Sequence, residues 1–179
     1  MLIRPAKLDD ARAVAEVQVA AWYAAYRGII PDDYLQSLSV ERRALIWRQS
    51  IEKGTPDLWI AADGPEVLGW IAFGQSRDSD KPSLVGEVWA LYVSPPHWSR
   101  GIGRELWLTA RARLRHKGFQ EATLWVLKRN ERALRFYRAA GFYPNELSVR
   151  NIKLGSAVLA EIRYETILPD SPWKITTER

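Results

Sequence analysis

The chain contains 179 residues, of which 47% are hydrophobic and 26% are charged, with a net charge of +5; this is typical of one globular domain rather than two. The absence of cysteine excludes a disulfide framework, a thiolate metal site and a cysteine acyl-enzyme, and with only two histidines we expect no metal. No signal-peptide pattern and no apolar run of about 18 residues occur, which predicts a cytoplasmic protein without a membrane partner.

The N-terminal half alternates between helix and strand signals. A short strand is predicted at residues 2–4, and a helix follows from Leu8-Asp9-Asp10 to about Tyr26, because acidic residues suit a helix N-terminus. Pro31 suits the start of a second helix, whose register is expected to break near residues 37–39 before it continues to residue 53. Strands are predicted at residues 58–62 and 67–73.

Residues 84–104 are the segment around which the chain is organised. They combine a strand rich in apolar and aromatic residues, a turn broken by two prolines, and Gly101-Ile102-Gly103 at the start of a basic helix. Unpaired N–H groups at a helix N-terminus and the close approach that glycine permits suit a phosphate. A dinucleotide-binding loop would need glycine where Leu106 stands, and a nucleotide-triphosphate loop would need Gly-Lys-Ser/Thr, so both readings are weakened.

The C-terminal half continues this alternation. The basic helix is expected to reach Lys117, and Gly118 suits its C-terminus. A strand is predicted at residues 121–127, then a helix that Asn130 caps and Gly141 ends. Residues 149–153 and 157–168 suggest a hairpin, and residues 169–179 a loosely held tail.

Two segments carry a resemblance to a known family. Leu91-Tyr92-Val93 followed by Gly101-Ile102-Gly103 resembles motif A of the GCN5-related N-acetyltransferase (GNAT) superfamily, with Trp98 at the position where the family has Gln or Arg. Residues 130–142 resemble its second motif, Asn-x-x-Ala-x-x-Phe-Tyr-x-x-x-Gly-Phe. The resemblance implies an α+β fold in a single domain over residues 1–168. Its mixed, mostly antiparallel sheet would have about seven strands, splayed between the fourth and fifth, and about four flanking helices.

The resemblance also implies an activity. The protein would transfer the acetyl group of acetyl-coenzyme A directly to a primary amine of a small molecule or a protein, in a ternary complex. The loop amides would surround the pyrophosphate, and the strand backbone would bind the pantetheine arm. The residues expected to bind the cofactor are Leu91, Tyr92, Val93, Trp98, Ser99, Arg100, Gly101, Ile102, Gly103, Arg104, Asn130 and Tyr137. The oligomeric state stays open, including a homodimer.

Two side chains are candidates for proton transfer. Glu87 stands six residues before Val93, where some family members place a catalytic glutamate, and we predict it to be the general base. The alternative for Glu87 is a solvated position at the start of the strand. Tyr137 matches the tyrosine that points at the sulfur in many relatives, and we predict it to be the general acid; its alternative role is core packing. Trp22, Tyr26 and Trp89 are candidates for the acceptor pocket, or else for an aromatic cluster that closes the core.

Two other functions compete with acetyl transfer. The first is a non-catalytic sensor that binds acyl-coenzyme A without turnover. The second is a nucleic-acid-binding protein that uses the arginines on one side of the basic helix, Arg100, Arg104, Arg111 and Arg115. A solvated helix face explains Arg111 and Arg115 equally well, whereas Arg100 and Arg104 lie at the phosphate end and are better candidates for anion contacts. No nucleic-acid recognition motif is present, so we expect no nucleic-acid partner.

Overall fold

The computed structural model describes residues 1–169, in which seven strands form one sheet in the order β1-β2-β3-β4-β5-β7-β6. Neighbouring strands are antiparallel except β4 and β5, which are parallel. The strands are β1 (Leu2–Pro5), β2 (Asp57–Asp63), β3 (Glu66–Gln75), β4 (Val85–Val93), β5 (Glu121–Leu127), β6 (Tyr143–Leu154) and β7 (Ala157–Ile167). The predicted mixed sheet is thereby confirmed.

The helices cover both faces of the sheet. They are α1 (Ala11–Tyr26), α2 (Asp32–Gln36), α3 (Val40–Lys53), α4 (Ile102–His116) and α5 (Glu131–Ala139), with the 3-10 turns η1 (Leu8–Asp10) and η2 (Pro95–His97). The described residues thus hold five α-helices rather than about four, because the second predicted helix is divided in two. Ser39 starts α3 afresh, since its side chain accepts a hydrogen bond from the Arg42 N–H at 3.2 Å.

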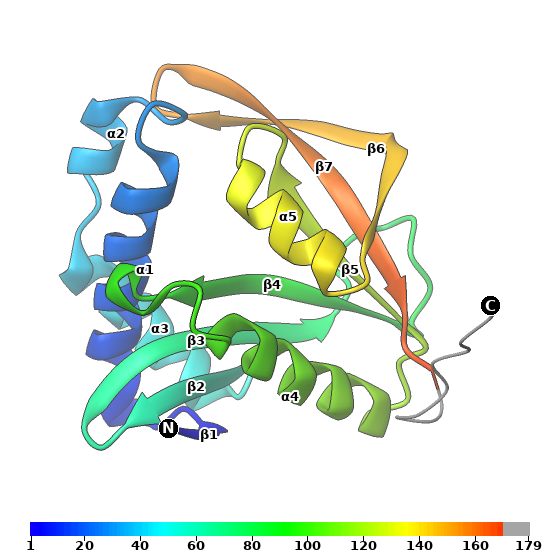
Figure 1. The fold of residues 1–179 in the computed structure, drawn as a ribbon, viewed down its shortest axis with the longest axis horizontal. Coiled ribbons are helices and arrows are strands. Elements are labelled where there is room, and N and C mark those ends of the chain that lie inside the picture. Colours follow the sequence, from blue (N-terminus) through cyan, green and yellow to red (C-terminus); the bar gives the residue numbers. More distant parts are fainter. Residues whose placement is uncertain (170–179) are drawn as a thin grey trace.

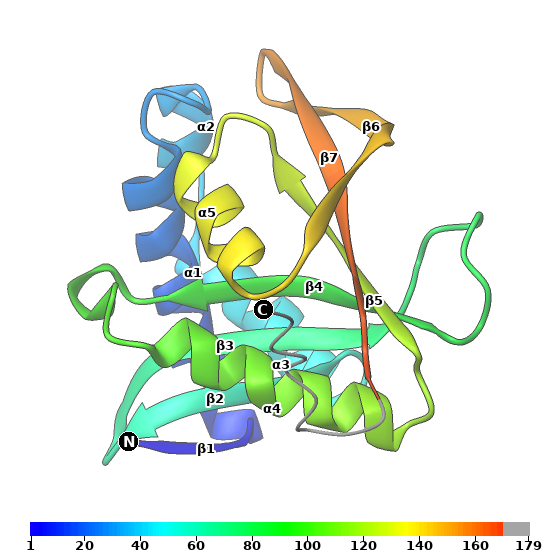
Figure 2. The ribbon, with the colours of Figure 1, turned by 45° about the vertical axis from the view of Figure 1, so that its right-hand side comes forward.

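The sheet splays after the first residues of β4. Strands β4 and β5 are paired only between Val85–Glu87 and Glu121–Thr123. Beyond this point the two strands diverge toward α1, as Figures 1 and 2 show from two directions. Within the described residues, the rest of β4 therefore has a strand partner, β3, on one side alone. The predicted splay between the fourth and fifth strands is confirmed.

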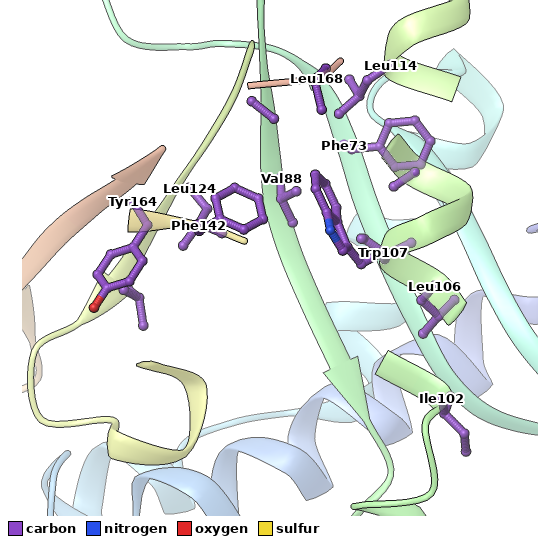
Figure 3. Packing of buried hydrophobic residues seen from close by; sticks show 14 of the residues in the cluster. Phe73, Val88, Ile102, Leu106, Trp107, Leu114, Leu124, Phe142, Tyr164 and Leu168 are labelled. Carbon is purple, nitrogen blue, oxygen red and sulfur yellow. The ribbon is translucent and has the colours of Figure 1, made fainter. Parts of the chain in front are cut away.

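Helix α4 holds β4 from one face of the sheet. Its buried residues recur at helical spacing and face the strands, as Figure 3 shows for Trp107 near Val88 and Leu114 near Phe73. A second cluster packs α1 against β2 and β3 on the other face. Packing on both faces of the sheet therefore holds β4 in place next to the gap between β4 and β5.

A network of ion pairs links the two halves of the splayed sheet. Arg163 of β7 donates to both carboxylate oxygens of Asp80, at 2.8 and 2.7 Å, and Asp80 belongs to the loop between β3 and β4. Asp78 of the same loop accepts a hydrogen bond from the Trp125 indole of β5 at 3.0 Å. Lys81 pairs with Glu165 of β7 at 2.9 Å. The loop between β3 and β4 therefore ties the first half of the sheet to β5 and β7.

Two further predictions concern membrane spans and the C-terminal tail. Within residues 1–169, no helix combines the length and apolar character needed to cross a membrane. The predicted tail at residues 169–179 lies outside the described residues except for Pro169. The division into one domain and a tail stays a prediction.

Candidate active site

A cavity of about 500 Å³ opens where β4 and β5 diverge. We call the residues from η2 to the first turn of α4, together with α5, the loop half of the cavity. The residues from α1, β5 and the β6–β7 hairpin form its α1 half. The α1 half is lined by Ala21, Trp22, Ala25, Tyr26, Ile30, Trp125, Val126, Leu127, Ile152, Leu154 and Glu161, and Val88 to Val93 of β4 line the cavity between the halves.

The loop half has the backbone geometry of an anion site. Ser99 and Gly101 both adopt left-handed conformations, with φ of 62° and 81°, and Gly101 is the N-cap of α4. A positive φ is unusual for serine, and such reversals turn successive N–H groups toward one concave side. The free N–H groups of the first helical turn and the positive end of the helix dipole add to this effect. The predicted glycine loop therefore suits a phosphate.

Trp98 closes this loop against its neighbours. Its indole N–H donates to the Val93 carbonyl oxygen at 2.7 Å, and the Arg132 guanidinium lies 3.9 Å from the centroid of its ring. One side chain thus joins the end of β4 to the start of α5. Trp98 lines the cavity and does not fill it.

The predicted cofactor-binding arginines lie outside the cavity lining. Arg104 pairs with Glu105 at 2.9 Å, its side chain is 71% exposed, and Arg100 is exposed as well. The arginines that do line the cavity are Arg132 and Arg135 of α5. Contacts of Arg100 and Arg104 with a cofactor stay a prediction.

Three tyrosines meet at the cavity, from α1 (Tyr26), β4 (Tyr92) and α5 (Tyr137). Burial raises the pKa of Tyr26 to about 12, with a smaller increase from the charge of Tyr137. Burial also raises the pKa of Tyr92 and of Tyr137 above the usual range of tyrosine. All three hydroxyls therefore keep their protons at neutral pH. Asn130 lies beside them and caps α5, because its Oδ1 accepts from the Ala133 N–H at 3.1 Å.

Glu87 does not line the cavity, and its surroundings differ from those predicted. It is 1% exposed, and its Oε2 accepts from the backbone N–H of Arg77 at 2.9 Å and from Arg77 Nε at 3.1 Å. The other oxygen pairs with the same guanidinium, which lies 4.3 Å from the centroid of the Trp89 ring. We expected the Glu87 carboxylate to lie among apolar and aromatic groups. The sequence did not reveal that the loop after β3 brings Arg77 into contact with this carboxylate. These contacts do not support direct proton transfer from an amine in the cavity to Glu87.

The predicted acceptor residues do lie together. Trp22, Tyr26 and Trp89 all line the cavity, and the rings of Trp22 and Tyr26 meet edge to face at 5.1 Å. The Trp22 Nε1 atom is buried and makes no hydrogen bond of regular geometry, although the Tyr92 hydroxyl interacts with it. A bound molecule with an acceptor atom could pair with this indole N–H.

Arg132, Trp125 and Glu161 are among the residues of the cavity wall that sequence reasoning missed. Arg132 stands two positions after Asn130 in the second motif, so its place in that motif could have revealed it. Trp125 of β5 and Glu161 of β7 belong to no motif, and only the pairing of β5 with β7 brings them together. No signal in the sequence distinguishes Glu161 from the glutamates outside the cavity.

Comparisons with known proteins agree with this fold. The family model described as acetyltransferase (GNAT) family matches residues 19–142. An uncharacterised N-acetyltransferase of Bacillus subtilis, YuaI, is 31% identical over 161 residues, which cover 89% of each chain. A spermidine N(1)-acetyltransferase of Thermoplasma acidophilum is 26% identical over 175 residues, covering 92% of this chain and 98% of the relative.

Solved structures show the same fold at lower identity. The PaiA N-acetyltransferase of Thermoplasma acidophilum, in complex with coenzyme A, has a TM-score of 0.71 at 23% identity and covers 93% of this chain and 98% of that one. YncA of Salmonella typhimurium, a putative acetyltransferase with its cofactor acetyl-coenzyme A, has a TM-score of 0.71 at 20% identity and covers 98% of each chain. Because the family model spans more than half of the chain, the chain belongs to the GNAT family and is an acetyl-coenzyme A-dependent N-acetyltransferase.

Proposed function

We propose that this protein transfers the acetyl group of acetyl-coenzyme A directly to a primary amine, with both substrates bound in the one cavity. The observation that carries the proposal is that a loop with the geometry of an anion site and a group of aromatic residues line the same space between β4 and β5. The spermidine acetyltransferase among the relatives supports an amine acceptor. The chain has no cysteine to carry an acetyl group, so we expect no acetyl-enzyme.

The residues of the loop half fit coenzyme A. The left-handed loop at Ser99 and Gly101 and the first turn of α4 would bind the pyrophosphate through N–H groups. The backbone of Leu91, Tyr92 and Val93 would hydrogen-bond the pantetheine arm, because this part of β4 has no partner on the side of β5. Bound acetyl-coenzyme A supplies an activated thioester.

Tyr137 is proposed as the general acid. Tyr137 lines the cavity, and its hydroxyl is protonated at neutral pH. The amine nitrogen would bond to the thioester carbon and lose a proton to water, and the hydroxyl would protonate the sulfur as the carbon–sulfur bond breaks. The amine must be uncharged to attack, and most alkylamines carry a proton at neutral pH. Glu87, the base proposed from the sequence, would have to act through water, since Arg77 lies on its carboxylate.

Thermal unfolding with acetyl-coenzyme A, coenzyme A, NADH and ATP in parallel tests cofactor binding. A ligand at a hundred times its Kd adds about 2.7 kcal/mol, which for a domain of this size raises Tm by roughly 5 to 11 °C. We expect this shift with the two coenzyme A ligands alone. No shift in a protein that unfolds cooperatively would overturn the proposal.

A second assay separates an enzyme from a sensor. Thiol release from acetyl-coenzyme A is followed with a panel of amines, and the acetylated amine is identified by mass. We expect turnover with at least one amine. Binding of acetyl-coenzyme A without turnover on any amine would identify a sensor instead.

A further inference from the structure

Glu161 is the acidic side chain that the fold brings to the cavity. It comes from β7, and within residues 1–169 no other carboxylate lines this space. Its side chain is 14% exposed, and its charge acts on the hydroxyl of Tyr26 in α1. The arginines of the cavity, Arg132 and Arg135, come from α5 in the loop half. The cavity lining therefore carries arginines where phosphate is expected and one carboxylate in the α1 half.

Aromatic rings share the cavity with this carboxylate. Trp22 and Tyr26 line it from α1, and Trp125 lines it from β5. Cations are attracted to the faces of such rings, and a carboxylate gives a strong charge-assisted hydrogen bond to an ammonium group. Rings and a single carboxylate together suit a positively charged group.

Arg150 of β6 is the neighbour that competes for Glu161. Its Nε donates to Oε2 at 2.8 Å, and its guanidinium lies 4.1 Å from the centroid of the Trp125 ring. This contact uses one carboxylate oxygen, and no described residue donates a hydrogen bond to Oε1. Arg163 of β7 lies 5.6 Å from the centroid of the Trp125 ring and is already paired with Asp78, Asp80 and Glu165. Arg43 of α3 lies 5.6 Å from the centroid of the Trp22 ring, and neither Arg163 nor Arg43 lines the cavity. Glu161 thus keeps one oxygen for a ligand.

The nitrogen that reacts is a poor partner for this carboxylate. That nitrogen must be uncharged to attack a thioester, whereas a neighbouring carboxylate stabilises the ammonium form. Glu161 is better suited to a second amino group that stays protonated while the first one reacts.

We propose that Glu161 and the surrounding rings form a subsite for a non-reacting positive charge of the acceptor, so that linear di- and polyamines are the preferred substrates. The inference rests on the proposed acetyl transfer to an amine and specifies its acceptor. Glu161 would contact the substrate and determine specificity through KM.

The kinetic test compares putrescine with n-butylamine, which has the same carbon chain and one amino group fewer. Glu161→Gln is expected to raise KM for putrescine by roughly ten- to a hundredfold, the size of one charge-assisted hydrogen bond. The kinetics with n-butylamine and the KM for acetyl-coenzyme A should stay unchanged. Glu161→Asp should restore part of the loss. An equal change for both amines, or no change, would overturn the proposal.

A matched control is Glu146→Gln, which removes the same charge from an exposed position of β6. It should leave both amines unaffected. A second variant tests the subsite without altering Glu161: Arg150→Gln removes the competing cation and should lower KM for putrescine. A raised or unchanged KM in Arg150→Gln would count against the subsite.

A binding measurement separates the subsite from the reaction. Putrescine with saturating coenzyme A should raise Tm of the wild-type protein and not of Glu161→Gln, whose unfolding without ligand checks that it folds. If putrescine shifts Tm of the wild type and not of Glu161→Gln, but no amine is acetylated, the subsite would be supported and acetyl transfer contradicted. Acetylation with equal Tm shifts and equal KM in both proteins would leave acetyl transfer standing and overturn the subsite.

Discussion

Tyr137 keeps its proton at neutral pH because burial raises its pKa, and this is the property that a general acid needs. Tyr137→Phe removes the proton and preserves the ring. We expect kcat to fall by about a hundredfold or more, the usual contribution of one acid or base, with the Kd for coenzyme A nearly unchanged. Steady-state kinetics and a thermal shift with coenzyme A check both parts.

The control for this variant is Tyr143→Phe, which changes an exposed tyrosine of β6. It should retain full activity. Unchanged kcat in Tyr137→Phe would remove this hydroxyl from the mechanism.

Glu87 offers a test between catalysis and structure. A direct base predicts that Glu87→Gln loses more activity at neutral pH than at high pH, where the amine is already uncharged. The contacts with Arg77 predict something else, namely a lower Tm with an unchanged shape of the pH profile. Breaking a fully buried pair costs about 3 to 5 kcal/mol. The loss here should be smaller, because the Arg77 side chain is 51% exposed and water can solvate it, and because the amide retains part of the hydrogen bonding. We expect the structural outcome, and a loss confined to neutral pH would restore Glu87 as the base.

At the scale of single elements, β3 and β4 approach each other closely at Gly69, which is paired with Val93. A Cβ atom placed there would lie 2.9 Å from the Tyr92 carbonyl oxygen and 3.1 Å from the Val93 Cα, and both are backbone atoms that cannot rotate away. Gly69→Ala should therefore push the end of β4 toward the cavity. We expect a loss of about 1 to 3 kcal/mol of stability and weaker binding of coenzyme A.

Gly74→Ala in the same strand is the control, because the nearest atoms to its Cβ would be those of the Trp89 ring at 3.9 Å. Thermal unfolding and coenzyme A titration of the two variants give the comparison. Equal behaviour of both variants would show that close approach at Gly69 does not shape the cavity.

The elements themselves were largely predictable from the sequence. Helical spacing of apolar residues in α4, the glycine loop before it and the Asn130 cap are local signals, and all three lie where they were expected. The break between α2 and α3 was also visible, because Ser37 and Ser39 interrupt an otherwise helical pattern. Local patterns of this kind do not depend on distant parts of the chain.

The cavity was predictable only in part, because it depends on contacts between distant segments. The sequence around Glu87 does not indicate that Arg77 pairs with its carboxylate. It also does not indicate that the pairing of β4 with β5 ends at Glu87. Glu161 enters the cavity through the pairing of β7 with β5, which brings together residues more than thirty positions apart. The family resemblance located the loop half and indicated Trp22 and Tyr26 of the α1 half, whereas the contribution of β5 and β7 to that half required the structure.

For the whole molecule, the tyrosines at the cavity make stability sensitive to alkaline pH. Folding raises the pKa of Tyr26 to about 12, mainly through burial, and raises those of Tyr92 and Tyr137 as well. A raised pKa in the folded state favours the protonated form. The contribution of these tyrosines to the free energy of unfolding is therefore complete below their unfolded pKa of about 10. It is lost as the pH rises through their pKa in the folded state.

We expect Tm to fall steeply as the pH rises above about 10. Lysine also titrates in this range, so the Tyr26→Phe variant is the reference, and its Tm should depend less on pH. Thermal unfolding across an alkaline pH series provides the measurement. Identical slopes for the variant and the wild type would contradict a contribution from Tyr26.

The way β4 ends its pairing with β5 has a consequence for what can enter the molecule. From Val88 onward, β4 is in effect an edge strand placed inside the fold. An edge strand on a surface invites a second polypeptide chain, with the risk of aggregation. Here α5 and the β6–β7 hairpin lie on the open side of β4. The backbone N–H and C=O groups of β4 can therefore bind a thin, linear molecule, but there is no room for a further strand with its side chains. An unpaired strand edge, which on a surface would promote aggregation, thus selects ligands by their shape.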